Sequence, residues 1–257
     1  MAQFLGLFNK DGCGGFLKLR YPERIVRRLM LHSVFIDVGL STAKNNEEVN
    51  VFDYMNYISM ASKEYPNAGI YYVVPDSHDV RQHFGYATAL LDIAIHRKVK
   101  PSGIPILVLH YYQDFKTIYK LFLMRFKDVF NKVIVGIPAR ILTASWRGGN
   151  PLKIQCRVKA DACIRYIEHV MTELFNAGFR DFHILGINRK EYRWLINSLE
   201  RSDGVSRLDI NVTADTDNYR LAANNKLRVR DYGKGKYMIS NESEACKWFE
   251  EWIKVRP

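Results

Sequence analysis

Short apolar segments alternate with longer amphipathic segments along most of the chain, and this alternation restricts the fold more than any other feature. Apolar segments such as 104–110 have the length of buried strands, whereas segments such as 51–65 repeat their apolar residues with the helical period. Apolar strands separated by crossover helices are typical of a parallel sheet. The expected strands are 33–39, 69–74, 104–110, 132–137, 182–187 and 207–213, with shorter ones at 227–229 and 236–240.

The number of strand–helix units favours a barrel. Counting from Ser33, the chain contains about eight such units, which is the number in a closed (β/α)8 barrel. We therefore expect an α/β fold, a single (β/α)8 TIM-like barrel over residues 33–257 that carries the catalytic site. Residues 1–32 are expected to form an N-terminal extension, as a lid or a hairpin, that packs on the barrel. A doubly wound open sheet is the alternative architecture.

Several classes of protein are disfavoured by the composition. The longest apolar segments, such as 104–112, are far shorter than the roughly 20 residues that a membrane-spanning helix needs. The first residues lack the basic and apolar regions of a secretory signal, so we expect a cytoplasmic protein that does not act on a membrane. The 4 cysteines have neither C-x-x-C spacing nor a histidine cluster beside them. We therefore expect no metal site and no cofactor.

Basic side chains are in excess, with 38 Lys and Arg against 27 Asp and Glu and a net charge of +11. Such an excess attracts polyanions, of which nucleic acid is the commonest. The alternative explanation is that the charge only keeps the protein in solution. Two basic clusters lie close to expected strand ends, one in the polar connection 138–157 and one after residue 225. The side chains expected to contact phosphates are Arg140, Arg147, Lys153, Arg228 and Arg230.

Polar residues at strand ends indicate where a ligand would bind. In parallel α/β architectures the carboxyl ends of the strands form the binding edge. Segments 73–79 and 208–219 each place an aspartate, Asp76 and Asp215, where a strand gives way to a helix. Either aspartate could simply cap a helix. Two carboxylates at one barrel mouth could instead divide a nucleophilic and an acid–base task, as in glycosyl transfer.

These segments resemble motifs of the tRNA-guanine transglycosylases, particularly those of the archaeal branch. The segment TADTDNY, which contains Asp215, is similar to the family's segment around the nucleophilic aspartate, and FHILG, which ends at Gly186, is similar to the strand end before it. Asp76 and Ser77 match the aspartate–serine pair that ends an early strand in the family. Gly136 takes the place of the glycine that lines the base pocket.

The resemblance implies a reaction and its partners. The family's zinc-binding cysteines have no counterpart, which makes the chain more similar to the compact zinc-free branch that inserts 7-deazaguanines into DNA. The implied activity is a base-exchange transglycosylase that replaces guanine with a 7-deazaguanine, such as 7-cyano-7-deazaguanine. Its partners would be nucleic acid, with DNA favoured and tRNA possible, and the free base; a homodimer is also possible. The alternatives are a catalytically inactive nucleic-acid-binding barrel and an unrelated barrel glycosidase or nucleosidase.

The same resemblance implies the roles of individual residues. Asp215 would attack C1′ of the nucleoside, and Asp76 would protonate the departing guanine and deprotonate the incoming base. Asp209 and Asp217 are the fallback carboxylates. The target base must leave its stack to reach such a site. The residues expected to bind it are Ser77, Gln113, Gly136 and Gly186. Tyr111 and Tyr112 either stack on the base or pack in the core, and His78 and His83 are expected to be caps or surface residues.

Overall fold

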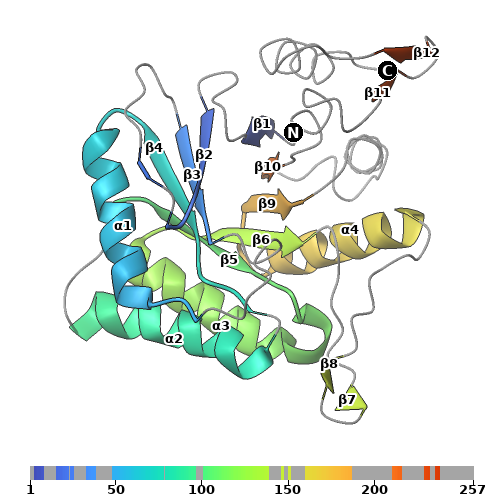
Figure 1. Cartoon of the computed structure of the whole chain (residues 1–257). Helices are drawn as coiled ribbons and strands as arrows, with labels where there is room; N and C mark the ends of the chain where they lie inside the picture. The colour runs from blue at the N-terminus through green and yellow to red at the C-terminus, as the bar shows by residue number, and fades with distance from the viewer. Residues whose placement is uncertain are drawn as a thin grey trace.

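A computed structural model describes residues 3–8, 16–22, 24–25, 33–38, 48–77, 79–96, 101–138, 146–147, 150–151, 160–186, 210–215, 229–231 and 235–237. The principal element in this part of the chain is one sheet of eight strands (Figure 1). The strands are β1 (Gln3–Phe8), β2 (Phe16–Arg20), β3 (Ser33–Asp37), β4 (Gly69–Val73), β5 (Ile104–Val108), β6 (Ile134–Pro138), β9 (Asp181–Leu185) and β10 (Asn211–Asp215). Their order is β1-β10-β9-β6-β5-β4-β3-β2, and every neighbouring pair is parallel.

The sheet is accompanied by four described helices and two short antiparallel strand pairs. The strand pairs are β7 (Trp146–Arg147) with β8 (Asn150–Pro151) and β11 (Val229–Asp231) with β12 (Gly235–Tyr237). The helices are α1 (Val51–Glu64), α2 (Val80–His96), α3 (Tyr112–Phe130) and α4 (Ala160–Asn176). Each of the four is too short or too polar to traverse a lipid bilayer.

Polar side chains fix where the helices begin. The Asn50 side chain accepts hydrogen bonds from the backbone N–H groups of Phe52 and Asp53, which satisfies donors in the first turn of α1. Asp79 does the same for α2 by accepting from Gln82 N–H at 2.8 Å. The sequence predicts α3 from residue 115, but the helix starts three residues earlier and has a kink at Phe115.

One face of the sheet packs against all four helices. Alternate strand residues such as Tyr72 and Leu107 belong to one buried cluster with Leu90 of α2, Phe126 of α3 and Met171 of α4. Figure 1 shows α1, α2 and α3 together on one side of the strands. The opposite face of the sheet has its own smaller cluster, which consists of Phe35, Val73, Ile106, Val108 and Ile134.

The sheet is strongly curled. Strands β1 and β2 follow one another in the chain and lie at opposite edges of the sheet, yet the connection 9–15 can span at most about 28 Å. A flat sheet of eight strands would separate its edges by about 34 Å. Cα atoms of β1 and β2 in fact come within 8 Å of one another. The curl therefore brings the two edges together and turns the carboxyl ends of all the strands toward a common rim.

The prediction of a closed (β/α)8 barrel is wrong. Within the described residues no hydrogen-bonded ladder joins β1 to β2, so the sheet is open. The strand count failed because β11 and β12, which were expected to complete the barrel, pair with each other and form a separate two-stranded sheet. The region from Ser33 onward contributes six strands to the sheet, and these lie side by side in chain order: β3, β4, β5, β6, β9 and β10. This order lacks the reversal of a doubly wound sheet.

The first 32 residues also differ from the expectation of a hairpin. Strand β1 pairs in parallel with β10, and β2 pairs in parallel with β3, so the two segments occupy opposite edges. A hairpin would have required antiparallel pairing between them. The division of the chain at residue 33 into an extension and a catalytic domain stays a prediction.

An ion-pair cluster between α3 and α4 leads to a test of stability. Glu173 contacts Lys116 at 3.0 Å and Lys120 at 2.7 Å. Burial by itself would raise the pKa of Glu173, but the hydrogen bonds and charges of Lys120 and Lys116 lower the pKa to about 2. Because this value lies below the ordinary 4.5, the stabilisation is present above pH 4.5 and is lost as the pH falls toward 2.

We expect Glu173→Gln to lower the free energy of unfolding by about 1 kcal/mol at pH 7. The effect is small because Lys116 and Lys120 are partly exposed, so that water screens the two ion pairs. Urea unfolding at pH 7 and pH 3 should show that the difference from wild type shrinks at the lower pH. Asp128→Asn, at an exposed position on α3, is the control. An equal loss of stability at both pH values would contradict the assignment.

Candidate functional site

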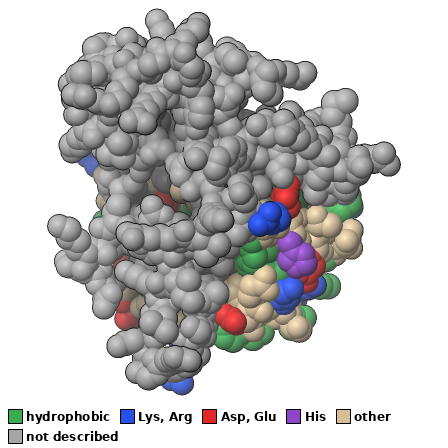
Figure 2. Space-filling view, turned by 90° about the vertical axis from the view of Figure 1, so that its right-hand side faces the viewer, with side chains coloured by type: hydrophobic (Ala, Val, Ile, Leu, Met, Phe, Trp, Pro, Cys, Tyr) green, Lys and Arg blue, Asp and Glu red, His purple; other side chains and the backbone are tan. Residues whose placement is uncertain are grey.

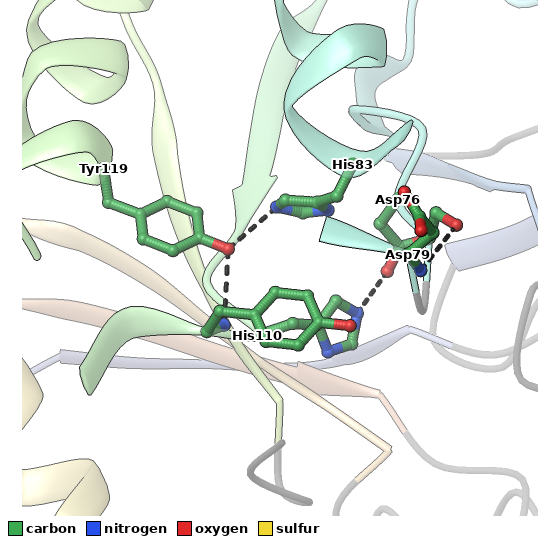
Figure 3. A network of polar contacts seen from close by, with 7 residues as sticks. Asp76, Asp79, His83, His110 and Tyr119 are labelled. Atoms are coloured by element: carbon green, nitrogen blue, oxygen red, sulfur yellow. Dashed lines mark hydrogen bonds and ion pairs between the residues drawn. The ribbon is translucent and has the colours of Figure 1, made fainter. Parts of the chain in front are cut away.

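Asp76 and His110 meet at the carboxyl edge of the sheet. Asp76 follows β4 and His110 follows the neighbouring strand β5. The Asp76 Oδ2 atom lies 2.5 Å from His110 Nε2 (Figure 3). Their side chains retain 11% and 16% of their exposure, respectively, so the pair is largely buried but within reach of a ligand. A carboxylate and an imidazole in contact can hold a proton between them and transfer it.

Backbone hydrogen bonds hold both segments in place beyond the ends of the strands. The N–H of Val74 donates to the carbonyl of Ile106, and the N–H of Leu109 donates to the carbonyl of Gly136. The hydroxyl of Tyr54 on α1 also donates to the carbonyl of Val73 at 2.7 Å. These contacts join the end of β4 to α1 and to β5, and they fix the backbone from which Asp76 projects.

Ser77 takes part in the start of α2. Its hydroxyl donates to the side-chain carbonyl oxygen of Gln82 and accepts from the N–H of Asp79 at 3.1 Å. Ser77 is buried. The residue therefore stabilises the turn between Asp76 and α2, and its predicted role in base binding stays a prediction.

Behind the Asp76–His110 pair lies a second, deeper pair. His83 on α2 and Tyr119 on α3 are both buried, and His83 Nε2 lies 2.9 Å from the Tyr119 hydroxyl (Figure 3). The N–H of Tyr111 donates to the same hydroxyl at 3.3 Å. Since that hydroxyl oxygen already accepts a hydrogen bond, we assign its own O–H as the donor to His83 Nε2, and His83 is then a neutral acceptor at this nitrogen.

The electrostatic surroundings also favour a neutral His83. Burial lowers the pKa of His83 most, and the positive charge that His110 can carry 5.9 Å away, measured between ring centroids, lowers it further. The charge of Asp76 opposes this effect only in part, and the resulting pKa is about 3. Burial also raises the pKa of Tyr119 well above its ordinary value. At neutral pH, therefore, His83 and Tyr119 place no net charge beside the Asp76–His110 pair.

Asp215 also lies at the carboxyl ends of the strands. It is the last residue of β10, where it pairs with Phe8 of β1. Because all the strands are parallel, the backbone of Asp215 and the residues after β4 and β5 are on one rim. Strands β9, β6 and β5 stand between β10 and β4, so only the curl of the sheet can bring these two positions toward each other.

Other residues predicted to bind the base occupy different environments. Gln113 is exposed in the first turn of α3, whereas Tyr111 and Tyr112 are buried and pack in the core. Gly136 lies inside β6, packed against Ile106 and Leu185. The exposed Gly186 directly follows β9 and has a φ of +66°. Gln113 and Gly186 are thus accessible, and Gly136 is enclosed.

The predicted phosphate contacts fall mostly outside the described part of the chain. Arg147 lies on β7 and Arg230 on β11. On the face shown in Figure 2, the described basic, acidic and histidine side chains are intermixed. The following residues lie outside the described residues: Arg140, Lys153, Arg228, Asp209, Asp217 and His78.

Comparisons with protein-family models, with curated proteins and with solved structures find no match to this chain. Within the described residues, no group of three or more His, Cys, Asp or Glu side chains could hold a metal ion. The geometry of the carboxyl rim is therefore the basis for an assignment of function.

Two histidines of the site were missed or misjudged from the sequence. His110 directly follows the apolar segment 104–109, so the strand-end rule that selected Asp76 would have selected it as well. His83 was expected to be a cap or surface residue, and its burial contradicts this. Its spacing from Tyr86, Ala87 and Leu90 places it on the apolar face of α2, which was the available signal.

The buried His83 predicts a dependence of stability on pH. Its folded pKa of about 3 lies below the ordinary 6.5, so the unfolded chain binds more protons between these values. Stability is therefore intact above pH 6.5 and falls as the pH drops toward 3. Between pH 7.5 and 5 the loss should be about 2 kcal/mol.

Urea unfolding of wild type and His83→Gln at these two pH values measures the effect. The variant should be less stable at pH 7.5, because it loses the bond to Tyr119, but its stability should fall less with acidity. His169→Gln, which removes an exposed histidine, should keep the wild-type dependence. If wild type and His83→Gln lost the same unfolding free energy between pH 7.5 and 5, the assignment of a neutral His83 would be disproved.

Gly136 allows a test of how tightly the sheet is packed. A Cβ atom at this position would lie 3.0 Å from Ile106 Cγ2, 3.1 Å from the Leu107 carbonyl and 3.1 Å from Leu185 Cδ1. We expect Gly136→Ala to cost about 1–3 kcal/mol of unfolding free energy, measured by urea denaturation. Gly85→Ala, in open space on α2, should instead be neutral or stabilising by up to about 1 kcal/mol. Equal effects of the two changes would contradict the packing at Gly136.

Proposed function

We propose that the protein is a base-exchanging transglycosylase that replaces guanine with a 7-deazaguanine in DNA or tRNA. The observation that supports the proposal is the contact between Asp76 and His110 on the rim where β10 ends in Asp215, because a carboxylate beside an imidazole is suited to proton transfer. A role limited to nucleic-acid binding would not require a largely buried carboxylate, because burying such a group is costly. The net charge of +11 suits a polyanionic substrate.

The first step breaks the glycosidic bond. The Asp215 carboxylate attacks C1′ of the target guanosine, and the bond between C1′ and N9 breaks with its electron pair going to N9. Asp76 gives its proton to N9, so guanine leaves as a neutral base. A covalent ester between Asp215 and the sugar remains.

The second step reverses the first with a different base. The Asp76 carboxylate removes the proton from N9 of the incoming 7-deazaguanine, and N9 attacks C1′. The bond between C1′ and the Asp215 oxygen breaks, which restores the free carboxylate. No oxidant, reductant or further reactant is needed, since the proton released in one step is recovered in the other.

The test is the exchange of radiolabelled guanine into double-stranded DNA and, separately, into bulk tRNA. We expect one polymer to take up label, and we expect Asp215→Ala and Asp76→Asn to reduce uptake by at least about 100-fold. A covalent protein–nucleic acid adduct, resolved on a denaturing gel, should depend on Asp215. Asp92→Asn, at an exposed position on α2, is the matched control and should retain activity.

The alternatives give different results in the same experiment. Release of free guanine without incorporation would indicate a nucleosidase or glycosidase that uses water. Salt-sensitive binding of nucleic acid with neither release nor incorporation would indicate a binding protein. Either result would overturn the proposed function.

A further inference from the structure

We propose that His110 is the positioning residue and proton partner of Asp76, so that the two side chains act as one acid–base unit. The inference rests on the proposed function for the reaction that the unit serves, and on the structure for the contact itself. His110 acts through Asp76, which is the group that would touch the substrate.

The contact is built by the fold, because 34 residues separate the two side chains along the chain. They meet since β4 and β5 are parallel neighbours, which puts the residues after both strands at the same level of the rim. The bond from Val74 N–H to the Ile106 carbonyl continues this pairing just beyond β4. The orientation of the Asp76 carboxylate therefore depends on two fixed backbone segments.

The unit holds one exchangeable proton between Asp76 Oδ2 and His110 Nε2. When Asp76 passes a proton to N9 of the leaving guanine, the lone pair released by the broken bond accepts it. An ionised Asp76 and a neutral imidazole remain. In the second step the proton from N9 of the incoming base restores the starting state, so each exchange leaves the proton count of the pair unchanged.

Four described groups that face the pair carry no positive charge that would compete with this proton. His83 faces it from α2 and is kept neutral by burial. Tyr111 and Tyr119 face the pair from the start and the second turn of α3, and burial keeps both protonated. Asp79, at the start of α2, is used in capping that helix. A second cation close to His110 would repel the imidazolium form, and none is present among these four groups.

This arrangement predicts the pH range of the reaction. A carboxylic acid alone loses its proton near pH 4, whereas an imidazole exchanges protons close to neutrality. A carboxylate that shares its proton with an imidazole can still act as an acid at neutral pH. Without the imidazole, Asp76 would have no neighbouring group from which to draw its proton.

The first measurement is the pH profile of guanine exchange, as kcat and KM from pH 4.5 to 9, for wild type, His110→Gln and His110→Asn. We expect kcat of both variants to fall at least about 100-fold at pH 7.5 and to recover in part near pH 5, with little change in KM. The alkaline limb of the profile should move to lower pH. His169→Gln is the control and should keep the wild-type profile.

The second measurement does not need activity. Ring ¹⁵N resonances of wild type and Asp76→Asn are compared by NMR at pH 7.5, with His110→Gln used for assignment. Loss of the carboxylate should shift the His110 Nε2 resonance, because this nitrogen loses its charged hydrogen-bond partner, Asp76 Oδ2. The signals of His169 should be unaffected. Melting curves verify that each variant is folded.

The outcomes separate the two proposals. Exchange with an unchanged pH profile in folded His110→Gln would overturn the proton partnership and leave the proposed function standing. An absence of exchange in wild type, with the His110 Nε2 resonance still dependent on Asp76, would overturn the proposed function and support the partnership. A His110 Nε2 resonance that is independent of Asp76 would overturn the partnership whatever the activity.

Discussion

The parallel pairing of every neighbouring strand is the constraint on which the rest of the structure depends. It forces the carboxyl ends of eight strands onto one rim and leaves one face of the sheet to four helices. The side chains that follow β4 and β5 become neighbours through this alignment alone. The curl of the sheet then decides how close the more distant strand ends, such as that of β10, come to them.

Polar groups at the rim are arranged in two layers with different chemistry. The outer layer, Asp76 and His110, keeps some contact with solvent and can exchange a proton. The inner layer, His83 and Tyr119, is buried, and the Tyr119 hydroxyl also accepts a hydrogen bond from the backbone N–H of Tyr111. Burial makes the inner layer electrically silent at neutral pH. Because His83 and Tyr119 stay neutral, the Asp76–His110 pair can gain or lose a proton without a second charge change beside it.

The sequence pattern predicts local elements well and long-range partners poorly. Strands β3 to β6 and helices α1 and α2 lie within a few residues of the predicted positions, because each carries a clear period of its own. The open sheet could not be predicted, because it depends on the pairing of β1 with β10 and of β2 with β3, which local periodicity does not specify. The strand-end rule locates Asp76, but its contact with His110 requires knowing that β4 lies beside β5. The same rule locates Asp215, the resemblance assigns its role, and its backbone position at the end of β10 is compatible with that role.

The placement of β1 has a consequence for how the chain folds. Within the described part of the chain it forms its hydrogen-bonded ladder with β10, which is about 200 residues away in the sequence. Strand β1 therefore cannot pair with β10 until the residues between them have been synthesised. Contacts of such high sequence separation are slow to form. The strand beside Asp215 is then among the last to be added, so the rim that carries the candidate chemistry is completed only when the fold is complete.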